Sequence, residues 1–283
     1  PQPGLFIGQF PSYIKPTPDG WMFYSDDPQA EQLYNHIQNL LNQDKIHSTF
    51  HLKNPCTSRW TKSVYTQAFQ KIQDYIVAGD CYQINLTQEF KGRAQGSLLA
   101  TAQAFWTLTE APYAGYLRIG DFELLSCSPE LFIDFEKNRK IITKPIKGTM
   151  PRYSDPVLDE QSKHNLKTSE KDQAENVMIV DLLRNDLSIY AETGSVKTPK
   201  LFNIESFNQV HHMVSEVEAT LKADVNPFEV LMSALPGGSI TGAPKIRAMQ
   251  IIAELEGAAR GAYCGSMGYF NFDGTGSWNI LIR

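Results

Sequence analysis

A lysine inside an apolar segment that ends in glycine is the residue of this chain best placed for covalent chemistry. Lys144 and Lys147 flank Pro145-Ile146, and Gly148-Thr149 follows them. A lysine enclosed by apolar residues loses hydration of its ammonium, which favours the neutral and nucleophilic amine. Most lysines are solvated instead, so this segment alone leaves both interpretations of Lys147 open.

Glu130 is a candidate acid catalyst. It ends the triplet Ser128-Pro129-Glu130 and precedes the apolar run Leu131-Phe132-Ile133, so it lies at the start of a predicted strand. Burial at such a junction would raise the pKa of the carboxyl toward the range of a general acid. The alternative is a solvated carboxylate in a turn.

Glu175 lies on an apolar face of a predicted helix that begins after Ser169. Met178, Ile179 and Leu182 follow Glu175 at i+3, i+4 and i+7. A carboxylate on such a face is costly unless it is paired. Two partners fit: a salt bridge to Arg184 or another basic neighbour, or Mg²⁺, which prefers hard oxygen ligands.

Two further segments have residue types suited to binding. The glycine-rich run 236–245 ends in Ala243-Pro244-Lys245 and predicts a helix start whose free N–H groups suit an anion, or else a plain turn. It lacks the spacing of a Walker A loop. His211 and His212 point to opposite sides if their segment is extended, so one can face a site while the other is simply hydrogen-bonded.

The elements that must position these residues alternate between hairpins and helices. A hairpin is expected over 10–24, followed by a helix that contains Leu33 and Ile37 and by a loop over 43–60. Paired strands and helices follow, with predicted strands at 82–86, 113–117, 122–125, 131–135, 140–143 and two within 263–283, and predicted helices at 65–77, 159–186, 225–235 and 243–258. This order predicts an α+β fold with a large antiparallel sheet and two regions, 1–60 and 61–283.

Composition excludes several function classes. The 283 residues have a net charge of −5 and no basic run, which disfavours nucleic acid and anionic membranes as partners. The four cysteines, Cys56, Cys81, Cys127 and Cys264, form no CxxC pair, which disfavours a zinc ribbon. No apolar run is long enough to span a membrane and no signal peptide is recognisable, so a cytoplasmic location is expected.

Taken in order, these segments resemble the chorismate-utilising superfamily. The resemblance runs from about Thr61 to Arg283 and rests on segments 79–86, 128–130, 145–149, 174–186, 212–215, 236–245 and 263–269. The superfamily includes anthranilate synthases, aminodeoxychorismate synthases, isochorismate synthases and salicylate synthases. The implied fold is a two-layer α/β sandwich with large antiparallel sheets flanked by helices.

Two positions sort the chemistry within that superfamily. Members that add water carry a lysine base where this chain has Gln83, and glutamine implies ammonia as the nucleophile. Anthranilate synthases have alanine where this chain has Lys147, whereas aminodeoxychorismate synthases carry lysine. The resemblance therefore implies that Lys147 attacks C2 of chorismate as the C4 hydroxyl leaves, and that ammonia then adds at C4 and expels the lysine.

The resemblance also implies roles for the other matching residues. Glu130 resembles the general acid, His212 a residue near the reacting ring, and Glu175 a Mg²⁺ ligand. The implied substrate-binding residues are Gln83, Thr149, Thr241, Gly242, Tyr263 and Arg283.

The resulting interpretation is component I of a Mg²⁺-dependent, chorismate-aminating transferase of para-aminobenzoate and folate synthesis. Its ammonia would come from a glutamine amidotransferase subunit. Relatives continue beyond the position of Arg283 with a further Mg²⁺ carboxylate and have more sequence before Pro1, so we expect this chain alone to be impaired. The alternatives are anthranilate synthase component I and a non-catalytic fragment that binds chorismate.

Overall fold

The computed structural model describes residues 4–43 and 49–283. The chain divides into two compact units, Pro1–Ser48 and Thr49–Arg283. The sequence places the boundary at residue 60 instead. The difference arises because residues 50–58, expected as a loop, form two short strands that pair within the second unit.

The first unit contains the predicted hairpin and helix. Strands β1 (Ser12–Thr17) and β2 (Gly20–Ser25) pair antiparallel across a turn at Gly20, where φ is +123°. A positive φ is readily adopted only by glycine, so this residue fixes the turn. Helix α1 (Ala30–Leu41) follows.

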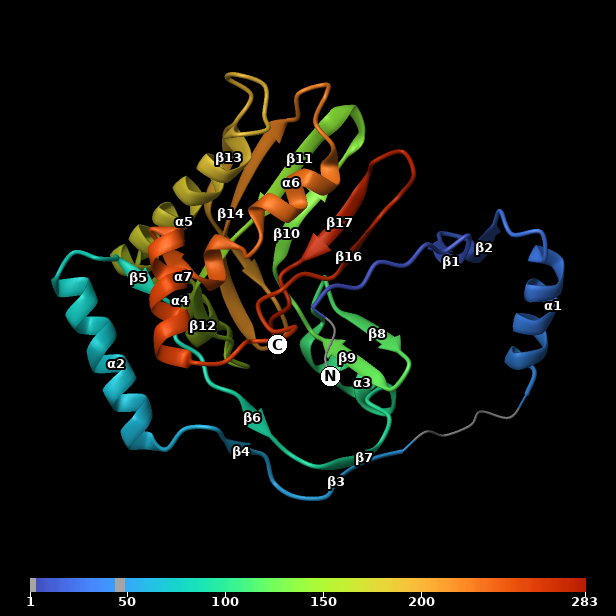
Figure 1. The fold of residues 1–283 in the computed structure, drawn as a ribbon, viewed down its shortest axis with the longest axis horizontal. Helices are drawn as coiled ribbons and strands as arrows, with labels where there is room; N and C mark the ends of the chain where they lie inside the picture. Colours follow the sequence, from blue (N-terminus) through green and yellow to red (C-terminus); the bar gives the residue numbers. More distant parts are fainter. Residues whose placement is uncertain (1–3, 44–48) are drawn as a thin grey trace. The chain divides into compact units, whose positions relative to one another are not determined.

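The second unit is built on one seven-stranded antiparallel sheet (Figure 1). Its strand order is β12-β14-β11-β10-β17-β16, with β13 on the other side of β14. The strands are β10 (Leu131–Phe135), β11 (Lys140–Lys144), β12 (Ile146–Pro151), β13 (Lys197–Ser206), β14 (Val210–Thr220), β16 (Gly268–Phe270) and β17 (Gly276–Asn279).

Strand β14 organises this sheet because it pairs with three others. β11 pairs with residues 217–220 of β14 and β12 with residues 210–214, so the two consecutive strands share one edge of β14. The sequence pattern predicts no strand in the place of β12, β13 or β14, although it allows an extended segment at His211-His212. The rest of the unit adds four short antiparallel pairs: β3 (Phe50–Leu52) with β7 (Ala94–Gly96), β4 (Thr57–Ser58) with β6 (Phe90–Lys91), β5 (Gln83–Ile84) with β15 (Gly242–Ala243), and β8 (Gly115–Ile119) with β9 (Phe122–Ser126).

Helices α4 and α5 contact β12 and β14 (Figure 1). The helices of this unit are α2 (Lys62–Val77), α3 (Leu99–Thr109), α4 (Pro156–Thr168), α5 (Glu170–Ser188), α6 (Pro227–Ala234) and α7 (Lys245–Glu256). Two 3₁₀ turns, η1 (Lys137–Arg139) and η2 (Gly238–Ile240), complete the list. The sequence predicts helix over 159–186 with a capped start at Ser169. The cap is confirmed: Ser169 has extended backbone and its hydroxyl accepts from the N–H of Asp172, so α5 begins there as a helix separate from α4.

The core lies between the sheet and helices α5 and α6. Ile141 and Val217 of the sheet, Leu187 of α5 and Leu231 of α6 belong to one cluster, and each is at most 2% exposed. Burying side chains of this size contributes roughly 1.5–3 kcal/mol each. This packing fixes the position of α5, which carries Glu175, relative to β14.

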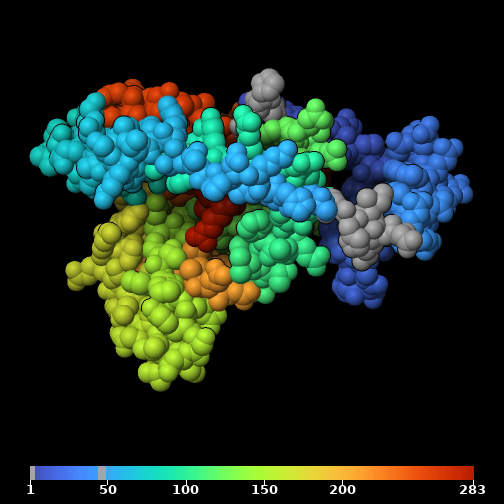
Figure 2. All heavy atoms as spheres, turned by 90° about the horizontal axis from the view of Figure 1, so that it is seen from below, coloured from blue at the N-terminus to red at the C-terminus, as the bar shows by residue number. Residues whose placement is uncertain are grey.

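The α+β class with antiparallel strands is confirmed. Within the described residues, one sheet is large and the remaining pairings are two-stranded. No helix in that part of the chain is long and apolar enough to cross a membrane. Figure 2 shows the end of the chain, in dark red, set back between neighbouring yellow-green and green segments of the second unit.

Candidate active site

Lys147 lies in a β-bulge of strand β12. Ile146 pairs with Val214 and Thr149 with His212, so Lys147 and Gly148 together oppose one residue of β14. Gly148 adopts φ +92°, and a Cβ there would lie 3.0 Å from Leu166 and Asp172. A bulge turns a side chain out of the regular alternation of a strand. This bulge therefore directs Lys147 away from its place in the sheet pattern, and glycine permits it.

The ammonium of Lys147 is paired with Glu175. Its Nζ lies 3.3 Å from Oε1 of Glu175, and the two side chains are 14% and 26% exposed. The same Glu175 oxygen accepts a hydrogen bond from the amide of Gln83, whose own Oε1 is buried and has no partner among the described residues. Gln83 and Glu175 thus act together as a support for Lys147, while Arg184 pairs with Asp181 instead.

Glu130 is a buried carboxyl, as its place before β10 predicts. The residue is 4% exposed, and burial raises the pKa of its carboxyl to about 7. Four influences act in the opposite direction: hydrogen bonds from Ser239 and from the N–H of Ile146, and the positive charges of Lys147 and Arg283. Desolvation is the larger effect, so near neutral pH this group exchanges its proton readily.

His212 is fully buried behind Thr149. Its Nδ1 lies 2.9 Å from the hydroxyl of Thr149, and its Nε2 lies 3.3 Å from a guanidinium nitrogen of Arg283. Burial and the charge of Arg283 lower the pKa of His212 to about 4. The ring is therefore neutral at pH 7, with Nε2 accepting from Arg283. His211 points to the other side, toward Ser206 and Asp159, as the extended segment predicts.

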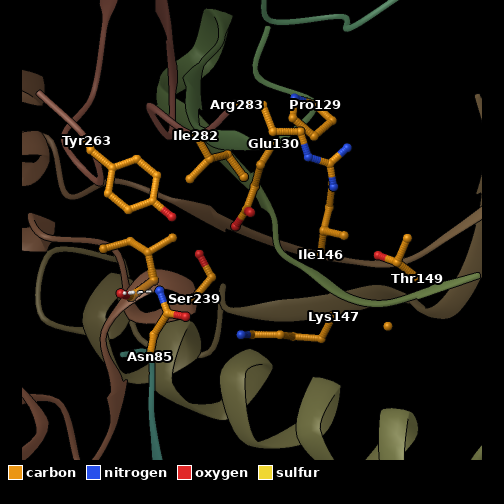
Figure 3. A pocket seen from close by; sticks show the side chains of 12 residues that line it. Asn85, Pro129, Glu130, Ile146, Lys147, Thr149, Ser239, Tyr263, Ile282 and Arg283 are labelled. Atoms are coloured by element: carbon orange, nitrogen blue, oxygen red, sulfur yellow. Dashed lines mark hydrogen bonds between the residues drawn. The ribbon is translucent and has the colours of Figure 1, made fainter. Parts of the chain in front are cut away.

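These residues surround one cavity of about 320 Å³. Its wall is formed by Asn85, Pro129, Glu130, Ile146, Lys147, Gly148, Thr149, Ser239, Ile240, Tyr263, Ile282 and Arg283. Figure 3 shows the carboxyl of Glu130 and the hydroxyls of Ser239 and Tyr263 directed toward the same space. The cavity thus brings together an acid, a lysine and an arginine from three separate segments.

The sequence-predicted site residues fall into three groups: residues of the cavity wall, residues linked to the wall by contacts, and residues away from it. Lys147, Glu130, Thr149, Tyr263 and Arg283 line the cavity. His212 contacts Arg283 and Glu175 contacts Lys147 from outside the wall, and Gln83 contacts Glu175 in turn.

Thr241 and Gly242, predicted to bind substrate, are not part of the cavity wall. The hydroxyl of Thr241 donates to the carbonyl oxygen of Gly237, and the residue is 3% exposed. Gly242 packs against the backbone of Gln83, where a Cβ would lie 2.1 Å from the carbonyl oxygen. The helix start at Lys245 is also outside the wall, because η2 supplies Ser239 and Ile240 in its place.

Asn85 and Ser239 are cavity residues that the sequence prediction omitted. Both lie inside segments that carry the resemblance, at 79–86 and 236–245. Their polar side chains next to Gln83 and to a glycine pair were the available signal. Which of several polar residues in a segment faces a cavity depends on the local backbone, which the sequence pattern did not specify.

The residues near Glu175 do not by themselves make a Mg²⁺ site. Across residues 4–43 and 49–283, no group of three or more His, Cys, Asp or Glu side chains is placed to hold a metal ion. Mg²⁺ requires near-octahedral oxygen coordination. Glu175 offers one carboxylate, and a lysine ammonium already contacts it.

Chemically, the cavity combines proton donation with nucleophilic attack and anion binding. Glu130 can deliver a proton to a leaving group, and Lys147 is the one lysine in the wall. Arg283 offers a permanent positive charge for a carboxylate. Such a site suits a small anionic substrate that loses a hydroxyl group.

Comparison with known proteins finds relatives over most of this chain. Residues 18–283 match a family model described as chorismate binding enzyme. Aminodeoxychorismate synthase component 1 of Klebsiella aerogenes is 43% identical over 262 residues, which are 93% of this chain and 57% of that protein. The protein of the same name from Salmonella typhimurium is 46% identical over 234 residues, covering 83% of this chain and 51% of that protein. The chain thus spans about half the length of these curated relatives.

A solved structure shows the same fold. Anthranilate synthase component I from Streptococcus pneumoniae superposes with a TM-score of 0.80 at 26% identity. The match covers 98% of this chain and 67% of that one. The arrangement of strands and helices described above is therefore that of a known enzyme fold.

Proposed function

Because this chain belongs to the chorismate binding enzyme family, we propose that it is the chorismate-aminating part of aminodeoxychorismate synthase component I. The reaction replaces the C4 hydroxyl of chorismate with an amino group from ammonia and yields 4-amino-4-deoxychorismate. One observation carries the proposal: Lys147 and a buried Glu130, whose pKa is raised to about 7, line the same cavity.

In the proposed reaction, Glu130 is the acid. Its protonated carboxyl gives the proton to the C4 oxygen, which leaves as water while the amine of Lys147 bonds to C2. Attack requires the neutral amine, so the ammonium must first lose a proton, and Glu175 is the carboxylate in contact with it. Ammonia then bonds to C4, the C2–nitrogen bond breaks, and Lys147 is released.

The other residues bind and orient in this proposal. Chorismate carries two carboxylates, and Arg283 and Tyr263 supply a guanidinium and a hydroxyl on the wall. His212 is neutral at pH 7 and accepts from Arg283, so it orients that guanidinium without adding charge. Gln83 holds Glu175 and has no basic group that could deprotonate water, which favours ammonia as the nucleophile.

Mg²⁺ stays a prediction of the resemblance. Glu175 would be its ligand in this chain, and the remaining oxygen donors would have to come from substrate, water or residues outside those described. Calorimetry with Mg²⁺ and chorismate tests this role without turnover. A Glu175→Gln variant should bind Mg²⁺ more weakly in the presence of chorismate, and equal binding would remove Glu175 as a ligand.

A glutamine amidotransferase subunit and a cytoplasmic location also belong to the proposal. The name "component 1" of the relatives supports a second component. Co-purification of a glutaminase-active subunit with the intact protein, from the soluble fraction of its cells, tests both.

Lys147→Ala is the decisive variant. It should abolish formation of 4-amino-4-deoxychorismate and can redirect ammonia to C2, which gives anthranilate. Lys144→Ala is the matched control, because Lys144 is the neighbouring lysine but pairs with Glu216 outside the cavity. Product analysis by chromatography separates the outcomes. Anthranilate as the main product of the wild type would favour anthranilate synthase component I, and unchanged amination by Lys147→Ala would remove the covalent role.

A further inference from the structure

Arg260 lies outside the cavity wall, with its side chain 14% exposed, and every one of its N–H groups is satisfied. Its Nε and one Nη donate to the two oxygens of Glu256, at 2.9 and 2.7 Å. The remaining donors reach the carbonyl oxygens of Asn85 (2.6 Å) and Ile240 (3.0 Å) and the sulfur of Cys264 (3.4 Å). A guanidinium has five N–H groups, so none is left over.

The groups that Arg260 joins belong to three separate parts of the cavity wall. Asn85 and Ile240 line the cavity themselves, and Cys264 follows Tyr263, which also lines it. Asn85 comes from the segment after β5, Ile240 from η2 and Tyr263 from the turn before β16. Arg260 itself is not part of the wall. Its guanidinium is therefore a common anchor for wall segments that are distant in sequence.

Glu256 holds the guanidinium of Arg260 in place. It is the last residue of α7 and is 5% exposed. Besides Arg260, its Oε1 accepts from the N–H and hydroxyl of Thr87, two residues after Asn85. A buried ion pair of this kind gains little net stability, because desolvation of both charges offsets their attraction. The ion pair instead sets the orientation of the guanidinium, because two parallel hydrogen bonds to one carboxylate permit a single orientation.

We propose that Arg260, held by Glu256, is a positioning residue that sets the spacing of Asn85, Ile240 and Tyr263 and thereby the fit of chorismate. The inference rests on the proposed function, because chorismate is the ligand whose fit is measured. It assigns to Arg260 no contact with the substrate. A displaced wall weakens binding, since interactions in a closed site depend on positions within about 1 Å.

Arg260→Lys in the intact protein tests the inference. Lysine keeps the charge, but its three N–H groups share one nitrogen and cannot reach the separate acceptors. Arg247→Lys is the matched control, because Arg247 also pairs with a carboxylate, Asp80, and none of its hydrogen bonds reaches a cavity residue. We expect Arg260→Lys to raise the Kd and KM for chorismate about tenfold and to change kcat much less, while Arg247→Lys changes neither.

The measurements are chorismate binding, steady-state kinetics and thermal unfolding of both variants. Equal KM values for Arg260→Lys and wild type overturn the inference, as does an equal rise for Arg247→Lys. If Arg260→Lys does not fold, Glu256→Gln replaces it, since loss of one acceptor should raise KM in the same direction. A wild-type protein that neither binds nor converts chorismate refutes the proposed function instead, so the two failures are distinguishable.

Discussion

Replacing Glu130 with glutamine should change how the stability of the protein depends on pH. The folded state raises the pKa of this carboxyl from 4.5 to about 7. Below pH 4.5 the group is protonated in both the folded and the unfolded chain and contributes no difference. As pH rises toward 7, the unfolded chain ionises first, so the wild type loses stability.

The size of this loss follows from the two pKa values. At about 1.4 kcal/mol per pKa unit, the raised pKa corresponds to roughly 3 kcal/mol in total. Linkage places about 2.5 kcal/mol of it between pH 5 and pH 8. Glutamine has a similar shape and does not titrate, so the wild type should lose about this much stability relative to Glu130→Gln over that range.

Urea unfolding of both proteins at pH 5 and pH 8 measures the difference. Glu160→Gln is the control, because its carboxylate is 73% exposed and its removal should leave the pH dependence of the wild type intact. If the stability difference between wild type and Glu130→Gln stays constant from pH 5 to pH 8, the carboxyl is not desolvated and the assignment of Glu130 as the acid loses its basis.

Three further predictions follow from the same geometry. Since Glu130 must be protonated to act, kcat/KM for chorismate should fall as pH rises above about 7, and this limb should vanish from the residual activity of Glu130→Gln. The fold lowers the pKa of His212 from 6.5 to about 4. Between these pH values the unfolded chain binds a proton that the folded chain does not, so the protein should lose stability as the pH falls from 6.5 toward 4. His212→Gln should flatten this acid-side loss in urea unfolding, and an unchanged profile would contradict the burial of a neutral ring. Gly148→Ala should destabilise the protein by about 1–3 kcal/mol, because φ is +92° and the new methyl meets Asp172 and Leu166. Gly194→Ala has a similar φ and open space around it, so an equal loss of melting temperature in both variants would show that backbone strain, not the contact, is responsible.

Sequence patterns were sufficient for elements whose cause is local. The hairpin around Gly20 and the helix start at Ser169 depend on residues a few positions apart. The same patterns missed β14, in which residues 211–215 are all buried, so that this part lacks the alternation that marks a strand with one solvated face.

The segments around Lys147 and Glu130 marked both residues as candidates, but each segment alone also allowed a solvated side chain. What the sequence determined by itself is therefore which residues are available and which local elements carry them. The sequence pattern did not predict which of these residues contact one another. The ion pair between Lys147 and Glu175 exists because a bulge in β12 turns the lysine toward α5, and that register depends on a partner strand more than sixty residues further along the chain.

Only the tertiary structure decided the environment of each group. Gln83 meets Glu175 across 92 positions of sequence, and Arg260 meets Asn85 across 175. Burial in the folded unit likewise raises the pKa of Glu130, and the groups that oppose this shift, Ser239 and Ile146, are distant from it in sequence. Desolvation and hydrogen-bond geometry vary over distances of an ångström, and such distances between remote segments are fixed by packing of the whole unit. The residue types were set locally, and their chemistry was set by the fold.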